Sequence, residues 1–153
     1  MIITQNCYNN IANKLHTLKY KEHPKMAEHL EECRNSGSLE DNPEYFQAFE
    51  DLQRLNAKID ELSNVLTSAC VFNESLKRDD TVTFGSTVKF KDVDSKKSKE
   101  YTILSIYDSD VNNGTISIES PFAKEMLGLH SGDYFDFNDK TYEIISICYY
   151  FQL

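Results

Sequence analysis

The chain turns at Gly37-Ser38-Leu39-Glu40-Asp41-Asn42-Pro43-Glu44-Tyr45, a short acidic segment between two long stretches with helical periodicity. Because the turn is short, the helices on either side of it must be antiparallel neighbours. At roughly 1.5 Å per residue, about 28 helical residues make a rod of about 40 Å. The carboxylates of Glu40, Asp41 and Glu44 would then gather at the end of this rod. Such an arrangement favours a function in which negative charge is delivered into a deep channel.

The segment after the turn carries an unbroken heptad pattern of apolar residues. Its apolar positions are Tyr45, Ala48, Leu52, Leu55, Ile59, Leu62, Leu66 and Ala69. This pattern predicts one helix of a coiled coil, and no Gly or Pro interrupts residues 44–70. Asn42 is a suitable N-cap, and Pro43 fits the first helical turn, where its missing N–H costs nothing.

The segment before the turn supplies the partner helix, with two apolar stripes that differ in register. The stripes are Ile11, Leu15 and Leu18, followed by Met26, Leu30 and Cys33. Leu15 and Leu30 are separated by one residue more than two heptads, so the register slips by one near Pro24. A proline inside a helix removes a hydrogen bond and bends the axis, which predicts a kink or break at His23-Pro24. Asn35-Ser36-Gly37 is expected to end this helix.

The periodicity changes from helical to alternating at about Val82. Strand-like apolar runs then follow at residues 82–90, 101–106, 115–119, 134–137 and 142–147. Asn138-Asp139-Lys140 is typical of a hairpin turn between the last two runs. Ser120-Pro121 predicts the start of one short helix, and Gly128 predicts its end. The second half is therefore expected to be a small antiparallel sheet with one short helix, after a linker at residues 73–80.

The composition excludes some classes of protein. A chain of 153 residues fits one medium domain or two small ones. No apolar run approaches the roughly 18 residues that span a bilayer, and the N-terminus carries no pattern of a secretory signal, so we expect a cytoplasmic protein. The formal net charge of −9 argues against simple electrostatic binding to duplex DNA, which depends largely on Lys and Arg.

The four cysteines are scattered and form no C-x-x-C pair; they are Cys7, Cys33, Cys70 and Cys148. In a cytosolic protein such cysteines are expected to be reduced and structural. Cys33 follows His29 by four residues, so the two could share a helix face and touch one metal ion, but no third ligand is evident. We therefore expect the free protein to hold no metal stably.

Several motifs of this chain occur together in one known family. They are the acidic turn of residues 37–45, Pro24 in the first helix, Phe84-Gly85-Ser86-Thr87-Val88, and Ser120-Pro121-Phe122-Ala123-Lys124-Glu125-Met126-Leu127-Gly128 followed by Ser131-Gly132-Asp133. In these motifs the chain resembles the bacterial Gre transcript-cleavage factors (GreA/GreB type). The matching family patterns are G-D-L-K-E-N-A-E-Y, F-G-A-T-V and S-P-I-A-R-x-L-x-G followed by G-D. The resemblance extends from about Ile11 to Tyr150.

The resemblance implies an α+β fold of two domains. Residues 1–75 would form an antiparallel coiled coil with its acidic tip at residues 37–45, and residues 76–153 would form a domain like the FK506-binding proteins (FKBP-like). The implied partner is bacterial RNA polymerase. The second domain would dock at the rim of the polymerase secondary channel through Glu119, Ser120 and Pro121, with Phe122 beside them. The coiled coil would pass down the channel to the active site, and a monomer fits so narrow a passage.

The resemblance also implies a mechanism in which the chain is not itself an enzyme and has no cofactor of its own. In the family, two tip carboxylates complete the coordination of a second Mg²⁺ that the polymerase binds weakly. They thereby speed the hydrolysis of backtracked RNA by the polymerase. The factor lends metal ligands to the active site of another protein.

This chain departs from the family pattern at the tip. Ser38 stands at the first tip acid and Asp41 at the second, where the family has Asp and Glu. Glu40 stands where the family often has Lys, and Glu44 matches an acid outside the metal pair. The family also contacts the RNA 3′ end through basic residues near the tip. Arg34 remains at one such position, whereas Phe49 replaces an Arg at another.

Two interpretations follow from these departures. In the first, the chain is a working cleavage factor in which Asp41 and either Glu40 or Glu44 hold the metal. In the second, the chain binds the secondary channel and inhibits or modulates the polymerase without supporting cleavage. Two further alternatives are a helical hairpin that serves as a spacer, dimerisation element or adaptor without touching polymerase, and a prolyl isomerase suggested by topology alone.

Overall fold

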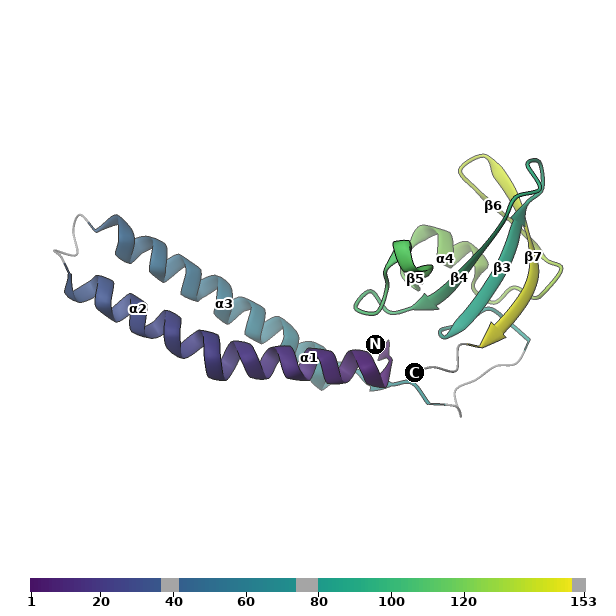
Figure 1. Ribbon diagram of the computed structural model, residues 1–153. Helices are drawn as coiled ribbons and strands as arrows, with labels where there is room; N and C mark the ends of the chain where they lie inside the picture. The colour runs from purple at the N-terminus through teal and green to yellow at the C-terminus, as the bar shows by residue number, and fades with distance from the viewer. Residues whose placement is uncertain (37–41, 74–79, 150–153) are drawn as a thin grey trace. The chain divides into compact units, whose positions relative to one another are not determined.

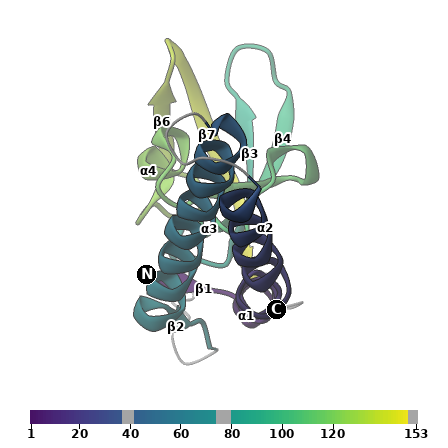
Figure 2. The same cartoon turned by 90° about the vertical axis from the view of Figure 1, so that its left-hand side faces the viewer.

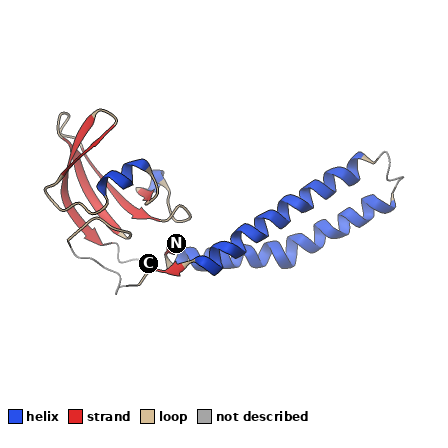
Figure 3. Ribbon diagram, turned by 180° about the vertical axis from the view of Figure 1, so that it is seen from behind, coloured by secondary structure: helices blue, strands red, loops and turns tan. Residues whose placement is uncertain are grey.

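The computed structural model describes residues 1–36, 42–73 and 80–149, and residues 37–41 at the predicted tip lie outside this description. The chain divides into two compact units (Figure 1). One unit comprises Tyr8–Ala69 and is a helical hairpin. The other comprises Met1–Cys7 together with Cys70–Leu153 and is built around a curled β-sheet (Figure 3). The first few residues of the chain therefore pack with the second half of the sequence.

The helical hairpin contains all but the first three residues of α1 (Gln5–Thr17), a π-helical turn η1 (Leu18–Glu22), α2 (His23–Asn35) and α3 (Pro43–Ser68). α2 lies alongside α3 (Figure 2). The predicted heptad supplies the packed face of α3: Ala48, Leu55, Ile59 and Leu62 are buried. Val65 is buried as well, and Ala69 is extended because the helix ends at Ser68. The predicted antiparallel hairpin is confirmed.

Of the kink or break predicted at His23-Pro24, the break is wrong, because the helix continues through this point and widens by one residue directly before it. Thr17 and His23, which flank η1, both keep right-handed helical dihedral angles. The N–H of His23 donates to the carbonyl of Leu18, five residues back, as a π-helical turn requires. This wider turn absorbs the extra residue between the two apolar stripes. It also relieves the crowding that the ring of Pro24 would cause in a regular helical turn.

The second unit contains a five-stranded sheet in the order β5-β4-β3-β7-β6. Its strands are β3 (Ser86–Asp92), β4 (Ser98–Leu104), β5 (Thr115–Ser117), β6 (Tyr134–Phe137) and β7 (Lys140–Tyr149). All neighbouring pairs are antiparallel except β4 and β5. The expectation of an entirely antiparallel sheet is therefore corrected. The pair is parallel because residues 105–114, with a short 3₁₀ turn η4 (Val111–Asn113), cross over instead of forming a hairpin.

The predicted local signals of the second unit are confirmed at the hairpin turn and the short helix. Asn138 and Asp139 both adopt positive φ between β6 and β7, as a two-residue hairpin turn requires. Helix α4 (Pro121–Met126) begins where the hydroxyl of Ser120 accepts the N–H of Ala123 at 3.2 Å. The first predicted strand begins later than expected, at Ser86, because residues 83–86 form a turn in which Gly85 has a φ of +84°.

The core of the second unit lies between α4 and the sheet. Its buried residues are Val82, Val88, Phe90, Ile103, Ile116, Ala123, Met126, Phe135 and Ile144. Ala123 and Met126 are fully buried, so α4 is fastened to the sheet by its inner face. This packing holds the segment before α4, the predicted docking loop, at a defined place on the unit.

The N-terminal segment is tied to the second unit by a parallel strand pair that the sequence did not predict. β1 (Ile2–Ile3) pairs with β2 (Cys70–Val71). The hydroxyl of Thr4 donates to the Asp108 carboxylate at 2.6 Å, and the Ser105 hydroxyl donates to the same carboxylate at 2.7 Å. Burial, followed by the neighbouring Asp108 charge, raises the pKa of the Cys7 thiol to about 12. Cys7 therefore stays a neutral thiol at physiological pH.

Among the described residues, none of the helices has the length and the hydropathy of a membrane-spanning segment.

Candidate functional site

The two helices of the hairpin are joined by one buried side chain at the base of the predicted tip. The side-chain oxygen Oδ1 of Asn42 accepts the backbone N–H of Tyr45 at 3.0 Å, and this bond caps the start of α3. The Asn42 amide also donates to the backbone carbonyl of Cys33 at 2.7 Å, near the end of α2. The same carbonyl accepts the Ser36 hydroxyl at 2.9 Å. Asn42 is only 8% exposed, so these bonds are shielded from water.

This arrangement fixes the two points between which the acidic turn runs. Ser38, Glu40 and Asp41 lie outside the described residues. Glu44 lies in the first turn of α3 and is exposed. A carboxylate is favourable there, because the start of a helix carries partial positive charge. The Asn42 cap therefore holds Glu44 and the end of the turn on a rigid helix.

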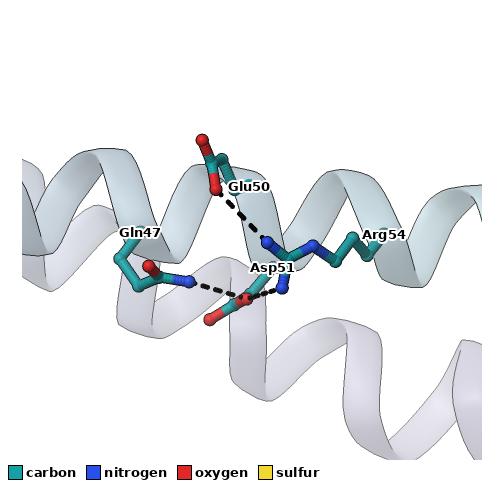
Figure 4. A network of polar contacts seen from close by, with 4 residues as sticks. All are labelled: Gln47, Glu50, Asp51 and Arg54. Carbon is teal, nitrogen blue, oxygen red and sulfur yellow. Dashed lines mark hydrogen bonds and ion pairs between the residues drawn. The ribbon is translucent and has the colours of Figure 1, made fainter.

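The surface of α3 next to the tip carries aromatic side chains and paired charges. Phe46 is 54% exposed and Phe49 is 42% exposed, and both rings contact the ring of Tyr45. Further along, Arg54 donates to Glu50 and Asp51, and Gln47 also donates to Asp51 (Figure 4). Such exposed pairs add little stability, but they compensate the Arg54 charge.

Arg34, the predicted RNA-contacting residue, lies in the last turn of α2. Its guanidinium is 3.7 Å from the carboxylate of Glu31, and both side chains are more than half exposed. The contact reduces the positive charge that Arg34 offers to a phosphate. Among the described residues beside the tip, Phe46 and Phe49 expose aromatic rings and Arg34 is paired with Glu31.

The predicted docking loop is held by its own hydrogen bonds. The N–H of Glu119 donates to the Ser117 hydroxyl at 3.1 Å, and the N–H of Ser120 donates to the Ser117 carbonyl at 2.9 Å. Glu119 and Pro121 are exposed, whereas Phe122 is half-buried. The loop therefore presents a carboxylate and a proline ring on a fixed backbone.

Phe122 belongs to an aromatic cluster that forms one wall of a cleft. Its ring lies 5.0–5.9 Å from five other rings, mostly edge to face; they are Phe90, Tyr101, Phe135, Phe137 and Tyr142. The cleft has a volume of about 810 Å³, and Ser120 and Phe122 both line it. The cleft was not predicted from the sequence. The aromatic residues of its wall come from four strands (β3, β4, β6 and β7) and from α4, and only the fold brings them together.

One ion pair stands at the mouth of the cleft. The Lys140 ammonium lies 3.2 Å from the carboxylate of Asp92. The N–H of Ser95, together with Lys140 and the N–H of Asp94, lowers the pKa of Asp92 to about 2, although desolvation opposes this shift. Asp92 in turn raises the pKa of Lys140. This carboxylate therefore stays ionised and is already satisfied by its three donors.

The cysteines and histidines form no metal centre in the part of the chain that the structure covers. His29 and Cys33 do lie on one helix face, with Nε2 and Sγ 3.7 Å apart. Across residues 1–36, 42–73 and 80–149, no group of three or more His, Cys, Asp or Glu side chains could hold an ion. All four cysteines are free thiols.

Comparisons with known proteins cover both units. Residues 1–71 match the family model "Transcription elongation factor, N-terminal", and residues 77–149 match "Transcription elongation factor, GreA/GreB, C-term". The chain belongs to the GreA/GreB family of transcription elongation factors. The resemblance inferred from the tip, the F-G-S-T-V segment and the S-P helix is thereby confirmed.

Named relatives in the GreA/GreB family align along most of the chain. Transcription elongation factor GreA of Aliarcobacter butzleri is 35% identical over 146 residues, covering 93% of this chain and 91% of its own length. GreA of Nitratiruptor sp. is 37% identical over 131 residues, covering 86% and 80%. The crystal structure of GreA factor homolog 1 from Thermus thermophilus aligns with a TM-score of 0.46 at 22% identity, covering 97% and 98%.

The double role of Asn42 in this GreA/GreB-family hairpin was only half predicted, since a sequence shows the cap but not the bond to α2. Asn42→Ala is expected to lower the free energy of unfolding of the hairpin by about 2 kcal/mol, because it removes a helix cap and leaves the Cys33 carbonyl with one partner fewer. Thermal unfolding followed by circular dichroism at the helical band measures the effect.

Two control variants separate the contributions of Asn42. Asn42→Asp keeps the cap acceptor and loses the amide donor, so its stability should fall between those of the wild type and Asn42→Ala. Asn64→Ala, on an exposed interior position of α3, should be neutral or slightly stabilising, because Ala is the better helix former. Equal losses from Asn42→Ala and Asn64→Ala would show that the bridge contributes nothing specific.

Proposed function

We propose that this GreA/GreB-family chain binds bacterial RNA polymerase through its secondary channel and stimulates cleavage of backtracked RNA. The acidic tip would lie near the catalytic Mg²⁺ of the polymerase, and arrested complexes would resume elongation. The observation that carries the proposal is the rigid base of the tip. Asn42, which directly follows Asp41 and stands two residues before Glu44, ties the two helices together in a chain whose two halves both match elongation-factor families.

The chemistry of the tip supports this role. Carboxylate oxygens are the protein ligands that Mg²⁺ prefers. Asp41, together with Glu40 or Glu44, would supply them to an ion held in the polymerase. Such an ion, when bound, activates water and stabilises the leaving oxygen in phosphodiester hydrolysis. The contribution of this chain is to present the carboxylates on a helix whose start is fixed. It is thus an accessory factor and not itself an enzyme.

The second unit would supply the attachment to the polymerase. Glu119, Ser120 and Pro121 form a loop whose backbone is held by Ser117 and whose following helix is anchored in the core. A rigid loop loses little conformational entropy on binding. We therefore assign it to the rim of the secondary channel, with Phe122 behind it.

A second candidate function is inhibition of the polymerase from the same channel without RNA cleavage. Two observations favour it. Ser38 replaces the first acidic ligand of the family pattern, and the hydroxyl of a neutral serine is a much poorer Mg²⁺ ligand than a carboxylate. Arg34 is paired with Glu31, and Phe49 stands where the family has a cation, so contact with RNA phosphates is reduced.

The Ser38→Asp variant tests whether the tip acts as a metal clamp. It restores the second carboxylate, so cleavage of RNA in stalled elongation complexes should become faster. We expect an increase of roughly tenfold, because substitutions of groups around a metal site change affinity or activity by about 10- to 100-fold. Release of short 3′ RNA fragments in Mg²⁺ measures the rate. Ser38→Asn is the matched control, because asparagine has the shape of aspartate without its charge, and it should give no increase in cleavage.

Two results would contradict the proposal. Cleavage that is the same in Ser38→Asp, Ser38→Asn and the wild type would mean that the tip does not reach the metal. A wild-type chain that neither binds the polymerase nor competes with another secondary-channel ligand would exclude both the cleavage and the inhibition hypotheses.

A further inference from the structure

The cleft of the second unit has the size and lining of a binding site. At about 810 Å³ it falls within the range of pockets that hold ligands or side chains of a partner. Its aromatic wall comprises Phe90, Tyr101, Phe122, Phe137 and Tyr142. Phe90 is buried in the core, and the other four rings are only half-buried. The wall is therefore anchored in the core through Phe90, and its other rings leave apolar surface that a ligand can bury.

The mouth of the cleft is positively charged, although the chain carries a net charge of −9. Lys97 and Lys99 line the cleft, are exposed, and form no ion pair with any other described residue. Lys140 lies at the same mouth but is paired with Asp92, whose carboxylate is also satisfied by two backbone N–H groups. Two lysines beside an apolar cleft are thus left without compensating charge. Their electrostatic complement is an acidic segment.

The cleft is continuous with the predicted docking loop. Ser120 belongs to that loop and lines the cleft, and Phe122, which follows the loop, stands at the centre of the aromatic wall. A partner that covered Glu119, Ser120 and Pro121 would therefore lie at the edge of the cleft. A protein partner fits this cleft better than single-stranded RNA. The rings contact one another edge to face, whereas a stacking platform for bases needs open ring faces.

We propose that the cleft receives a large apolar side chain from an acidic segment of the RNA polymerase, and that Lys97 and Lys99 pair with the carboxylates of that segment. This assignment rests on the proposed function, since it concerns the partner of the same docking surface. The aromatic wall supplies affinity by removing apolar surface from water. The lysines supply orientation and rate of association.

Charge reversal at one lysine tests the electrostatic part. Lys99 lies opposite Phe90 on the neighbouring strand and so faces the cleft, whereas Lys89 precedes Phe90 and faces the other side of the sheet. The full-length chain, fluorescently labelled, is titrated with bacterial core RNA polymerase. Lys99→Glu should raise the Kd by about tenfold, because it sets like charges against each other. Lys89→Glu, the matched control, should leave the Kd unchanged within about twofold.

A substitution at the exposed rim tests the cleft without disturbing the core. Val111 lines the cleft and is 63% exposed, so a change there should leave folding intact. Val111→Glu should weaken binding about as much as Lys99→Glu, since it adds a negative charge at the mouth. Val111→Lys has a similar size and the opposite charge, and it should bind at least as well as the wild type.

The outcomes separate the cleft from the function as a whole. If the wild type bound the polymerase and Lys99→Glu and Val111→Glu bound it with the same Kd, the cleft assignment would be overturned and the proposed function would stand. If Lys99→Glu and Val111→Glu bound a single-stranded RNA oligonucleotide more weakly than the wild type but bound the polymerase equally well, the cleft would be an RNA site and the assignment would be overturned. Failure of the wild-type chain to bind the polymerase would overturn the proposed function and the cleft assignment with it.

Discussion

Replacement of Asp41 by alanine is expected to reduce the release of 3′ RNA fragments from stalled elongation complexes by at least about tenfold. In the proposed mechanism, Asp41 is the tip residue that keeps a carboxylate at one of the two positions expected to bind the metal. Its removal takes away the strongest candidate ligand for Mg²⁺. Fragment release measured against time, at saturating factor and fixed Mg²⁺, gives the ratio.

Two control variants test whether the loss of cleavage comes from the loss of a metal-binding carboxylate. Asp41→Asn keeps the shape of the side chain and should lose as much activity as Asp41→Ala. Asp60→Ala removes an equal charge from an exposed position well along α3 and should keep wild-type cleavage. If Asp41→Ala cleaved RNA as fast as Asp60→Ala, Asp41 would have no role as a ligand.

Met126→Ala is expected to lower the free energy of unfolding of the second unit by about 3 kcal/mol, because it leaves a cavity in a fully buried site. Met126 fastens α4 to the sheet, and α4 follows directly from the predicted docking loop. Urea unfolding followed by near-ultraviolet circular dichroism, which reports on the packed aromatic rings, measures the loss.

The neighbouring residue on the same helix supplies the control. Glu125 is exposed, and Glu125→Ala should change the stability by less than about 0.5 kcal/mol. Weakened polymerase binding by Met126→Ala, at a temperature where the unit remains folded, would extend the effect to the docking loop. Equal unfolding midpoints for Met126→Ala and Glu125→Ala would contradict the packing described for α4.

The elements that the sequence predicted well are those whose signals are local. The heptad from Tyr45 onward lies on the packed face of α3, and Asn42 caps that helix. Ser120 caps α4, and the Asn138-Asp139 pair turns the last hairpin. In each case the residues that carry the signal also form the element, so the pattern needs no knowledge of the tertiary structure.

The elements that were missed depend on contacts between distant residues. The pairing of β1 with β2 joins residues nearly seventy positions apart through strands of two residues, too short to show a period. The parallel pair of β4 and β5 depends on a crossover whose local turn at Asn112-Asn113-Gly114 does not specify the direction of the strand that follows. At Pro24 the register slip was detected, but the sequence could not distinguish a π-helical turn from a break.

The candidate site divides in the same way. The acidic tip and the predicted docking loop are contiguous motifs, so both are visible in the sequence. The cleft is assembled from β3, β4, the β6–β7 hairpin and the start of α4, so it appears only in the fold. The bridge from Asn42 to Cys33 likewise needed the packed hairpin, because it links two helices across the turn.

The proposed function is tested most directly by the action of the wild-type chain on stalled elongation complexes of bacterial RNA polymerase in Mg²⁺. Cleavage and nucleotide addition are followed in the same reaction. We expect release of short 3′ RNA fragments above the rate of the polymerase alone, followed by resumed elongation. Absence of fragments together with slowed nucleotide addition would contradict this expectation and would identify the chain as an inhibitor of the secondary channel.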